Sequence, residues 1–150
     1  MSLQKKIEAE MKLAMKAKDK VRLQALRAVK SQILLAKSEK SGDEELSQER
    51  EVQILMKAVK QRKDSLEIYQ KEGREELAAT EKAEIEVIEE FLPKMLSEDE
   101  VRTEVKAILT EIGADSPKDM GKAMGVVMKK LAGKAENKTI SSVVKELLAN

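Results

Sequence analysis

The chain has 150 residues, 41% of them apolar and 38% charged, with a formal net charge of +1, which predicts a soluble globular protein of one or two small domains. It contains no histidine and no cysteine, so it lacks the usual zinc and haem ligands and the Ser-His and Cys-His nucleophile pairs, which argues against an ordinary hydrolase. Tyr69 and Phe91 are the only aromatic residues, which is too few for the base-stacking platforms of single-strand nucleic-acid binders.

Apolar residues recur at helical spacing through the first 92 residues and predict helices, with no strand pattern and no internal repeat. Asp19 has the position of an N-cap for the second helix, and Ser41-Gly42 is predicted to end that helix. Ser47 is the predicted N-cap of the third helix, which stops near Gly73. The inward residues of these three helices are predicted to be Leu3, Ile7, Met11, Ala14 and Met15; Leu23, Leu26, Val29 and Ile33; and Val52, Leu55, Met56, Val59, Leu66 and Tyr69.

Pro93 marks the predicted domain boundary. It has no backbone N–H and disfavours helix for the residue before it, so the fourth helix is expected to end there. Directly after it, Ser97 and Glu100 have the spacing of a capping box, which starts a new helix. We therefore expect an all-α fold with an N-terminal helical domain of about four helices, residues 1–93, and a C-terminal three-helix domain, residues 94–150. The inward residues of the fourth helix are predicted to be Ile85, Ile88 and Phe91.

The three helices of the C-terminal domain are bounded by turn and cap signals. The first is expected to end at Gly113, and the second opens at Ser116-Pro117, with proline at the first helical position, where a missing N–H is harmless. Asn137 is the predicted cap of the third helix. The inward residues of the first and last helices are predicted to be Val101, Val105, Ile108 and Ile112, and Ile140, Val143, Val144 and Leu147.

The net charge hides an uneven distribution along the chain. Residues 1–40 carry eleven basic and four acidic side chains, a balance of +7, whereas residues 41–92 carry eight basic and fifteen acidic ones, a balance of −7. Residues 117–150 carry seven basic and three acidic side chains, a balance of +4. In helical proteins such blocks more often face each other across a bundle than recruit partners, so the first two blocks are predicted to compensate each other.

Gly121 and Gly125 lie in the middle of the second C-terminal helix, where each costs about 0.5 to 1 kcal/mol relative to alanine. On a helical wheel they stand between a large apolar face and two lysines, Lys122 and Lys129. Two interpretations are open: the smooth strip lets a phosphate chain lie against the backbone beside ammonium groups, or it admits a neighbouring helix at short range. The apolar face is predicted to be core and consists of Met120, Met124, Val127, Met128 and Leu131.

Further basic residues follow this helix in the sequence. Lys130, Lys134 and Lys138 lie close by, with Gly133 in the turn before the last helix, whose N-terminal amides favour anions. Because aromatic residues are nearly absent, any RNA is expected to be recognised through its backbone and shape. The predicted RNA-binding residues are Gly121, Lys122, Gly125, Lys129, Lys130, Gly133, Lys134 and Lys138.

Three stretches of the sequence resemble one family: VKQRKDSLEIYQKEGREELA, FLPKMLSEDEV and DMGKAMGVVMKKLAGKAENKTISSVVKELL. Over essentially its whole length, the chain is similar to stand-alone YqeY-like proteins of the GatB/YqeY family. The resemblance implies an all-helical architecture and, for the C-terminal part, a similarity to the tail domain of the B subunit of the bacterial tRNA-dependent amidotransferase. That enzyme converts mischarged Glu-tRNA or Asp-tRNA to the amide form, and its tail is the part implicated in holding tRNA.

The family pattern maps onto much of the region rich in glycine and lysine. The chain departs from the pattern at Lys129, where the family often has proline, and at Glu136-Asn137, where it often has Asp-Gly. The turn geometry and the anion site are therefore not carried over from the family. The matching residues are Met120, Gly121, Lys122, Gly125, Met128, Gly133, Lys134, Ala135 and Leu147.

The resemblance implies a tRNA-binding or translation-associated protein with no catalytic chemistry of its own. One alternative is a protein-interaction adaptor that acts through its charged helical faces, with amidotransferase subunits or another translation protein as partners. A second alternative is a component of a carbon–nitrogen ligase with glutamine as amido-N-donor. The kinase-like and amidase portions of the amidotransferase have no counterpart in this chain.

No catalytic residue, metal site or cofactor is predicted. The nucleophile candidates, Ser141 or Ser142 with Lys145 at helical spacing, are interpreted as helix surface. The neighbouring glutamates of the fourth helix are interpreted as solvated groups rather than as a Mg²⁺ site; they are Glu86, Glu89 and Glu90.

Location and partners follow from what the chain lacks. No apolar run approaches the roughly 18 residues of a membrane-spanning helix, and the start, MSLQKKIEAEM, lacks the apolar core of a signal peptide. Together with the absence of cysteine, this predicts a cytoplasmic protein with no membrane partner. The predicted partner is structured RNA, with tRNA as the first candidate.

Overall fold

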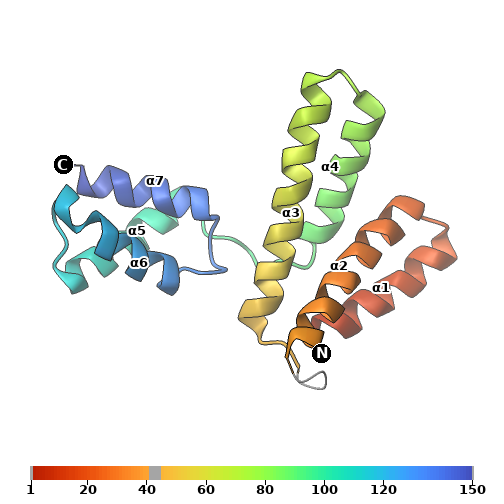
Figure 1. Ribbon diagram of the computed structural model, residues 1–150, viewed down its shortest axis with the longest axis horizontal. Helices are drawn as coiled ribbons and strands as arrows, with labels where there is room; N and C mark the ends of the chain where they lie inside the picture. Colours follow the sequence, from red (N-terminus) through yellow and green to blue (C-terminus); the bar gives the residue numbers. More distant parts are fainter. Residues whose placement is uncertain (1, 41–44, 150) are drawn as a thin grey trace. The chain divides into compact units, whose positions relative to one another are not determined.

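The computed structural model describes residues 2–40 and 45–149, and within these ranges the chain forms seven α-helices and one short 3₁₀ turn, with no strand (Figure 1). The all-α class predicted from the sequence is confirmed. The chain divides into two compact units, residues 1–92 and 93–150. Each unit has a hydrophobic core of its own.

The N-terminal unit consists of two helical hairpins (Figure 1). In the first, α1 (Leu3–Ala17) is antiparallel to α2 (Lys20–Glu39), and in the second, α3 (Gln48–Lys71) is antiparallel to α4 (Glu75–Glu89). Because α2 packs against α4 as well as against α1, it joins the two hairpins. The largest fully buried side chains of this unit are Ile7, Leu26, Ile33, Leu55, Ile88 and Val29.

The helix ends of this unit follow the local signals. The side chain of Asp19 accepts a hydrogen bond from the amide of Arg22 at 3.1 Å, and that of Ser47 accepts one from the amide of Arg50 at 3.1 Å, so both predicted N-caps are confirmed. After α3, Gly73 has φ +70°, a left-handed conformation that glycine adopts without the steric cost of a Cβ atom. The predicted stop near Gly73 is therefore confirmed.

Two details of this unit differ from the prediction. Met15 is 50% exposed rather than inward, because the helix turns about 100° per residue and the buried stripe passes through Ala14. Phe91 follows α4 instead of ending it and packs partly buried against the core. The predicted end of α2 at Ser41-Gly42 lies outside the described residues.

A buried ion pair joins α3 to α4. The Nε of Arg62 lies 3.4 Å from the Oε2 of Glu84, and these side chains are only 16% and 6% exposed. The Nη1 of Arg62 also donates a hydrogen bond to the carbonyl of Ala58 at 3.1 Å. The Oε1 of Glu84 and the Oε2 of the neighbouring Glu81 are buried without a hydrogen-bond partner in the described chain. Arg62 therefore supplies the positive charge that offsets the two poorly solvated carboxylates.

The C-terminal unit is a three-helix arrangement with one extra turn. It contains α5 (Glu98–Ile112), the 3₁₀ turn η1 (Pro117–Asp119), α6 (Met120–Lys130) and α7 (Asn137–Leu148). α7 packs against both α5 and α6. The fully buried residues of this core are Val101, Val105, Ala123, Val127, Ala135, Ile140, Val143, Val144 and Leu148.

The predicted capping box at the start of α5 is confirmed. The Oγ of Ser97 accepts from the Glu100 amide at 3.2 Å, and the Oε1 of Glu100 accepts from the Ser97 amide at 3.1 Å. The bond from the Ser97 amide is the main cause of the lowered pKa of Glu100. The predicted end of α5 at Gly113, with φ +70°, is also confirmed. The prediction that Asn137 caps the last helix is wrong: Asn137 is the first residue of α7, and Glu136 holds the N-cap position without a side-chain cap bond.

Limited trypsin digestion is expected to cut first after Lys94. Lys94 is exposed in the irregular segment between α4 and α5, whereas the backbone on either side is tied into helices with separate cores. Mass spectrometry of the earliest fragments measures the site. A first cut inside α3 or α6 would show that the boundary segment is better protected than a helix and would contradict this expectation.

Candidate nucleic-acid interface

A short turn leads into α6, and the buried residues of that helix show which side of it faces solvent. The Oδ2 of Asp119 accepts hydrogen bonds from backbone amides of the preceding loop, and Pro117 opens the 3₁₀ turn rather than the α-helix itself, which starts at Met120. Ala123 and Val127 are fully buried. Because they mark the inner side of α6, residues on the opposite side of the wheel must face outward.

Gly121 and Gly125 lie on this exposed side. A Cβ atom added at either position would meet no neighbouring atom within 4 Å. The interpretation that these glycines admit a neighbouring helix is therefore wrong for the described chain, because no helix approaches them there. Their backbone is open to solvent, and contact with an outside ligand stays a prediction.

Lys122 and Lys129 stand beside the glycines with exposed side chains. Neither forms an ion pair or a hydrogen bond with the described residues. Their ammonium groups are thus available to an anion that lies along the helix. Gly121, Lys122, Gly125 and Lys129 are called the glycine face below.

The remaining predicted RNA-binding residues lie elsewhere in the unit. Lys130 lies on the flank of α6 toward α5, where its Nζ is 3.1 Å from the Oε2 of Glu111. Gly133 and Lys134 belong to the turn between α6 and α7, and Gly133 has φ +76°. Lys138 is exposed in the first turn of α7. The structure therefore brings only part of the predicted set onto one face.

The methionines of α6 border the glycine face. Met120, Met124 and Met128 are each partly buried and pack against the core of the C-terminal unit. The three methionines were predicted to be core residues, and this is correct for the part of each side chain that packs inward. Their outer sides give the glycine face an apolar and adaptable edge opposite the lysines.

The segments around α6 are held by long-range contacts. The amide of Leu96 donates to the carbonyl of Lys134 at 2.9 Å, which ties the chain before α5 to the turn after α6. The Nη2 of Arg102 on α5 lies 3.0 Å from the Oε2 of Glu146 on α7, and this contact is the main cause of the raised pKa of Arg102. These contacts position the two helices against which the buried side of α6 rests.

The residues considered as catalytic candidates lie at or near the surface. Ser142 and Lys145 are exposed on α7, and Ser141 is partly buried. Among the three glutamates considered for Mg²⁺, Glu86 and Glu89 are exposed on α4, and Glu90, directly after α4, pairs with Arg22 at 2.7 Å. Within residues 2–40 and 45–149, no group of three or more carboxylates is placed to hold a metal ion.

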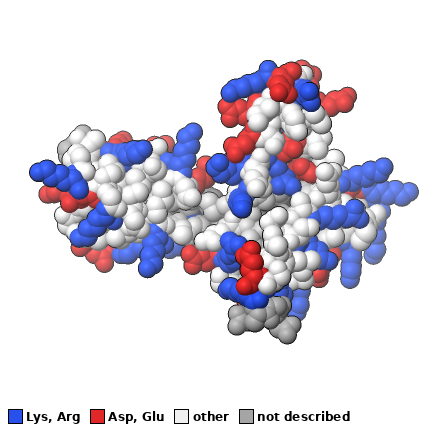
Figure 2. All heavy atoms as spheres, viewed as in Figure 1, with Lys and Arg blue, Asp and Glu red and all other residues white. Residues whose placement is uncertain are grey.

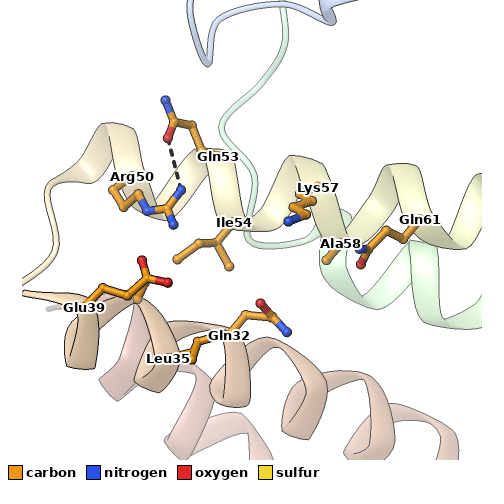
Figure 3. Close-up of a pocket in the computed structure, with 10 residues that line it drawn as sticks. Gln32, Leu35, Glu39, Arg50, Gln53, Ile54, Lys57, Ala58 and Gln61 are labelled. Carbon is orange, nitrogen blue, oxygen red and sulfur yellow. Dashed lines mark hydrogen bonds between the residues drawn. The ribbon is translucent and has the colours of Figure 1, made fainter.

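A shallow groove of about 120 Å³ runs between α2 and α3 in the N-terminal unit (Figure 3). Ile54 and Ala58 belong to its apolar lining, and Leu35 at its edge is 55% exposed. The Nη1 of Arg50 donates to the Oε1 of Gln53 at 3.4 Å, a long hydrogen bond between two of the lining side chains. The mixture of amide, apolar and charged groups does not single out one class of ligand.

Known proteins match this chain over nearly its whole length. A family described as Yqey-like protein matches residues 4–148. A relative from Kluyveromyces lactis, named Altered inheritance of mitochondria protein 41, mitochondrial, is 32% identical over 142 residues, covering 93% of this chain and 72% of the relative. Proteins of the same name from Lachancea thermotolerans and Pyrenophora tritici-repentis are 32% and 25% identical, covering 74% and 95% of this chain and 60% and 79% of their own lengths.

The names of these relatives contradict the cytoplasmic location predicted from the sequence, because all three are called mitochondrial proteins. Composition misleads here since the absence of cysteine bears only on disulfide formation and does not separate one reducing compartment from another. None of the described helices combines the length and apolar character needed to cross a membrane.

Proposed function

Since the chain belongs to the Yqey-like protein family, we propose that it binds structured RNA, with tRNA as the first candidate, through the glycine face of α6. The observation that carries the proposal is the open backbone at Gly121 and Gly125 beside two lysines that no other described residue neutralises. The proposed role is recognition, and it requires no catalytic group on this chain.

The glycine face has the surface that a phosphate backbone requires. Side chains on an ordinary helix hold a ligand away from the main chain. Two glycines on successive turns, about 5 to 6 Å from each other, leave a smooth strip instead. Lys122 and Lys129 then supply point charges along one edge of that strip. Since such contacts read the backbone rather than the bases, the lack of aromatic residues is no obstacle.

The resemblance to the amidotransferase B subunit supports tRNA as the first candidate. The run from Asp119 to Leu148 is the part that is similar to the tail of that subunit, which is implicated in holding tRNA. The relation to the tail is part of the proposal, and a role beside amidotransferase subunits would be consistent with it.

Filter binding of total tRNA over a series of salt concentrations tests the lysines. Lys122→Ala and Lys129→Ala should each weaken binding and reduce the slope of log affinity against log salt by about 0.7 to 0.9, because each removes one phosphate contact. Lys106→Ala, which removes an exposed lysine from α5, is the matched control. Equal slopes for all three variants would contradict the assignment of the lysines.

The adaptor function gives a different experimental pattern. It predicts weak tRNA binding that the α6 variants leave unchanged, together with a protein partner that binds in the absence of RNA. A pull-down with the full chain at low salt, with and without nuclease treatment, separates this outcome from RNA binding.

A further inference from the structure

The charge blocks of the N-terminal unit do not compensate each other as the sequence predicted. Among the basic side chains of residues 1–40, only Arg22 reaches an acidic side chain of the described part of residues 41–92, at 2.7 Å from Glu90. Lys30 pairs with Glu8 inside the first hairpin, at 3.4 Å. Most of the positive charge of α1 and α2 is therefore left facing solvent.

The uncompensated charge gathers where α1 turns into α2. Lys12 and Lys16 lie one turn apart on α1, Lys18 is in the turn, and Lys20 opens α2. All four side chains are exposed, and none forms an ion pair with the described residues. Figure 2 shows Lys and Arg side chains crowded over this end of the hairpin. These four lysines are called the turn surface below.

The acidic residues near the turn surface offset only part of its charge. Asp19 is the only acidic residue between positions 11 and 38, and its carboxylate is engaged in capping α2. Glu10 and Glu90 both pair with Arg22, at 2.9 and 2.7 Å. Glu10 and Glu90 are thus directed at Arg22 rather than at the lysines. Glu8, which pairs with Lys30, also lies near enough to Lys12 to offset part of its charge.

Lys18 has a backbone conformation that would suit glycine. Its φ and ψ are 57° and 32°, and it is the one non-glycine residue with positive φ in the described chain. The helix ends of the same kind after α3 and α5 carry Gly73 and Gly113, as expected where a Cβ atom is unfavourable. Because glycine would fit this turn better, a lysine here indicates that the positive charge of Lys18 has a role of its own.

We infer that the turn surface binds the phosphate backbone of RNA, as a second contact separate from the glycine face. The inference rests on the proposed function for the identity of the polyanion. Compact ammonium groups without bidentate geometry suit phosphates recognised by charge alone. An anionic lipid surface fits less well. The exposed apolar residues nearby, Leu13 and Met15, are about 200° apart around α1 and cannot enter a lipid layer together.

The test is Lys18→Gly in the full chain, measured by filter binding of tRNA over a salt series. We expect severalfold weaker binding at about 0.1 M salt and a slope reduced by about 0.7 to 0.9, with a melting temperature that is unchanged or higher. Lys16→Ala should act in the same way, whereas Lys60→Ala, which removes an exposed lysine from α3, should not. Unchanged affinity and slope for both turn variants would overturn the inference, as would absence of tRNA binding by the native chain.

Two further arms separate this inference from the proposed function and from a lipid ligand. If the Gly125→Glu variant binds tRNA as tightly as the native chain, the proposed function is wrong. If the Lys18→Gly variant binds tRNA as tightly as the native chain, this inference is wrong. Loss of vesicle binding in Lys18→Gly without any change in tRNA binding, measured with phosphatidylserine vesicles, would also overturn the inference and assign the turn surface to lipid.

Discussion

Replacing Arg62 with leucine is expected to lower the free energy of unfolding of the N-terminal unit by about 3 to 5 kcal/mol. Glu84, whose side chain is 6% exposed, would keep a buried charge with no cation beside it. The Oε1 of Glu84 already lacks a hydrogen-bond partner in the described chain. After the substitution, the Oε2 of Glu84, which now faces Arg62, would lack a partner as well. Denaturant unfolding followed by circular dichroism measures the change.

A double variant separates the loss of the partner from the loss of packing. Arg62→Leu combined with Glu84→Leu should recover most of the stability, because replacing both members of a buried pair with apolar residues is often neutral or stabilising. If Arg62→Leu alone costs less than about 1 kcal/mol, the pair behaves like a surface ion pair. That result would contradict the buried geometry.

The same cluster gives a dependence of stability on pH. Burial, and secondarily the charge of Glu84, raises the pKa of Glu81 above 4.5, while Arg62 opposes this shift. The folded chain thus holds the Glu81 proton more tightly than the unfolded chain, so this stability is present at low pH and is lost as the pH rises from 4.5 through the raised pKa. Glu81→Gln should remove that dependence and raise the melting temperature at neutral pH.

Local signals were enough to predict several helix ends. Asp19, Ser47 and Ser97 cap helices through bonds to amides three residues later, and Gly113 ends α5 in a left-handed conformation, all of which depend only on nearby residues. Asn137 shows the limit of such signals. The chain can place a capping residue one position inside a helix, and a single sequence does not reveal the shift.

The buried cluster was missed because it depends on packing between two helices. One signal was present: Glu81 and Glu84 precede Ile85 and Ile88 by four residues, which places both carboxylates on the inward side of α4. A glutamate in line with buried isoleucines requires a partner. Which residue on α3 supplies that partner follows only from the pairing of the helices.

The glycine face was partly predictable. The helical wheel places Gly121 and Gly125 beside the lysines, but it does not show whether another helix covers them, and the open space around both is visible only in the fold.

The charge blocks show the same limit. A balance of +7 against −7 does not show which side chains can reach one another, and no lysine of the turn surface forms an ion pair with a described residue.

Gly125→Glu is expected to weaken tRNA binding about tenfold or to abolish it, while leaving the C-terminal unit folded. A side chain at this position enters open space, and glutamate has a higher helix propensity than glycine, so the unit should gain about 0.5 kcal/mol or more. Bulk then holds the phosphates away from the backbone, and the new carboxylate, one turn from Lys122 and Lys129, opposes their charge.

Two further variants at the same position separate bulk from charge. Gly125→Ala adds one small group and should weaken binding only slightly. Gly125→Lys keeps the positive charge of the surface but adds bulk. If close approach to the backbone matters, Gly125→Lys should also weaken binding, whereas it should strengthen binding if the surface attracts RNA by charge alone.

The most direct test of RNA recognition by the glycine face is a titration of labelled tRNA with the native chain and with Gly125→Glu, at one salt concentration and with melting curves of both. We predict that the native chain binds, that the variant binds about tenfold more weakly or not at all, and that its melting temperature is equal or higher. Equal affinity of a folded variant and the native chain would contradict an RNA contact at Gly121 and Gly125.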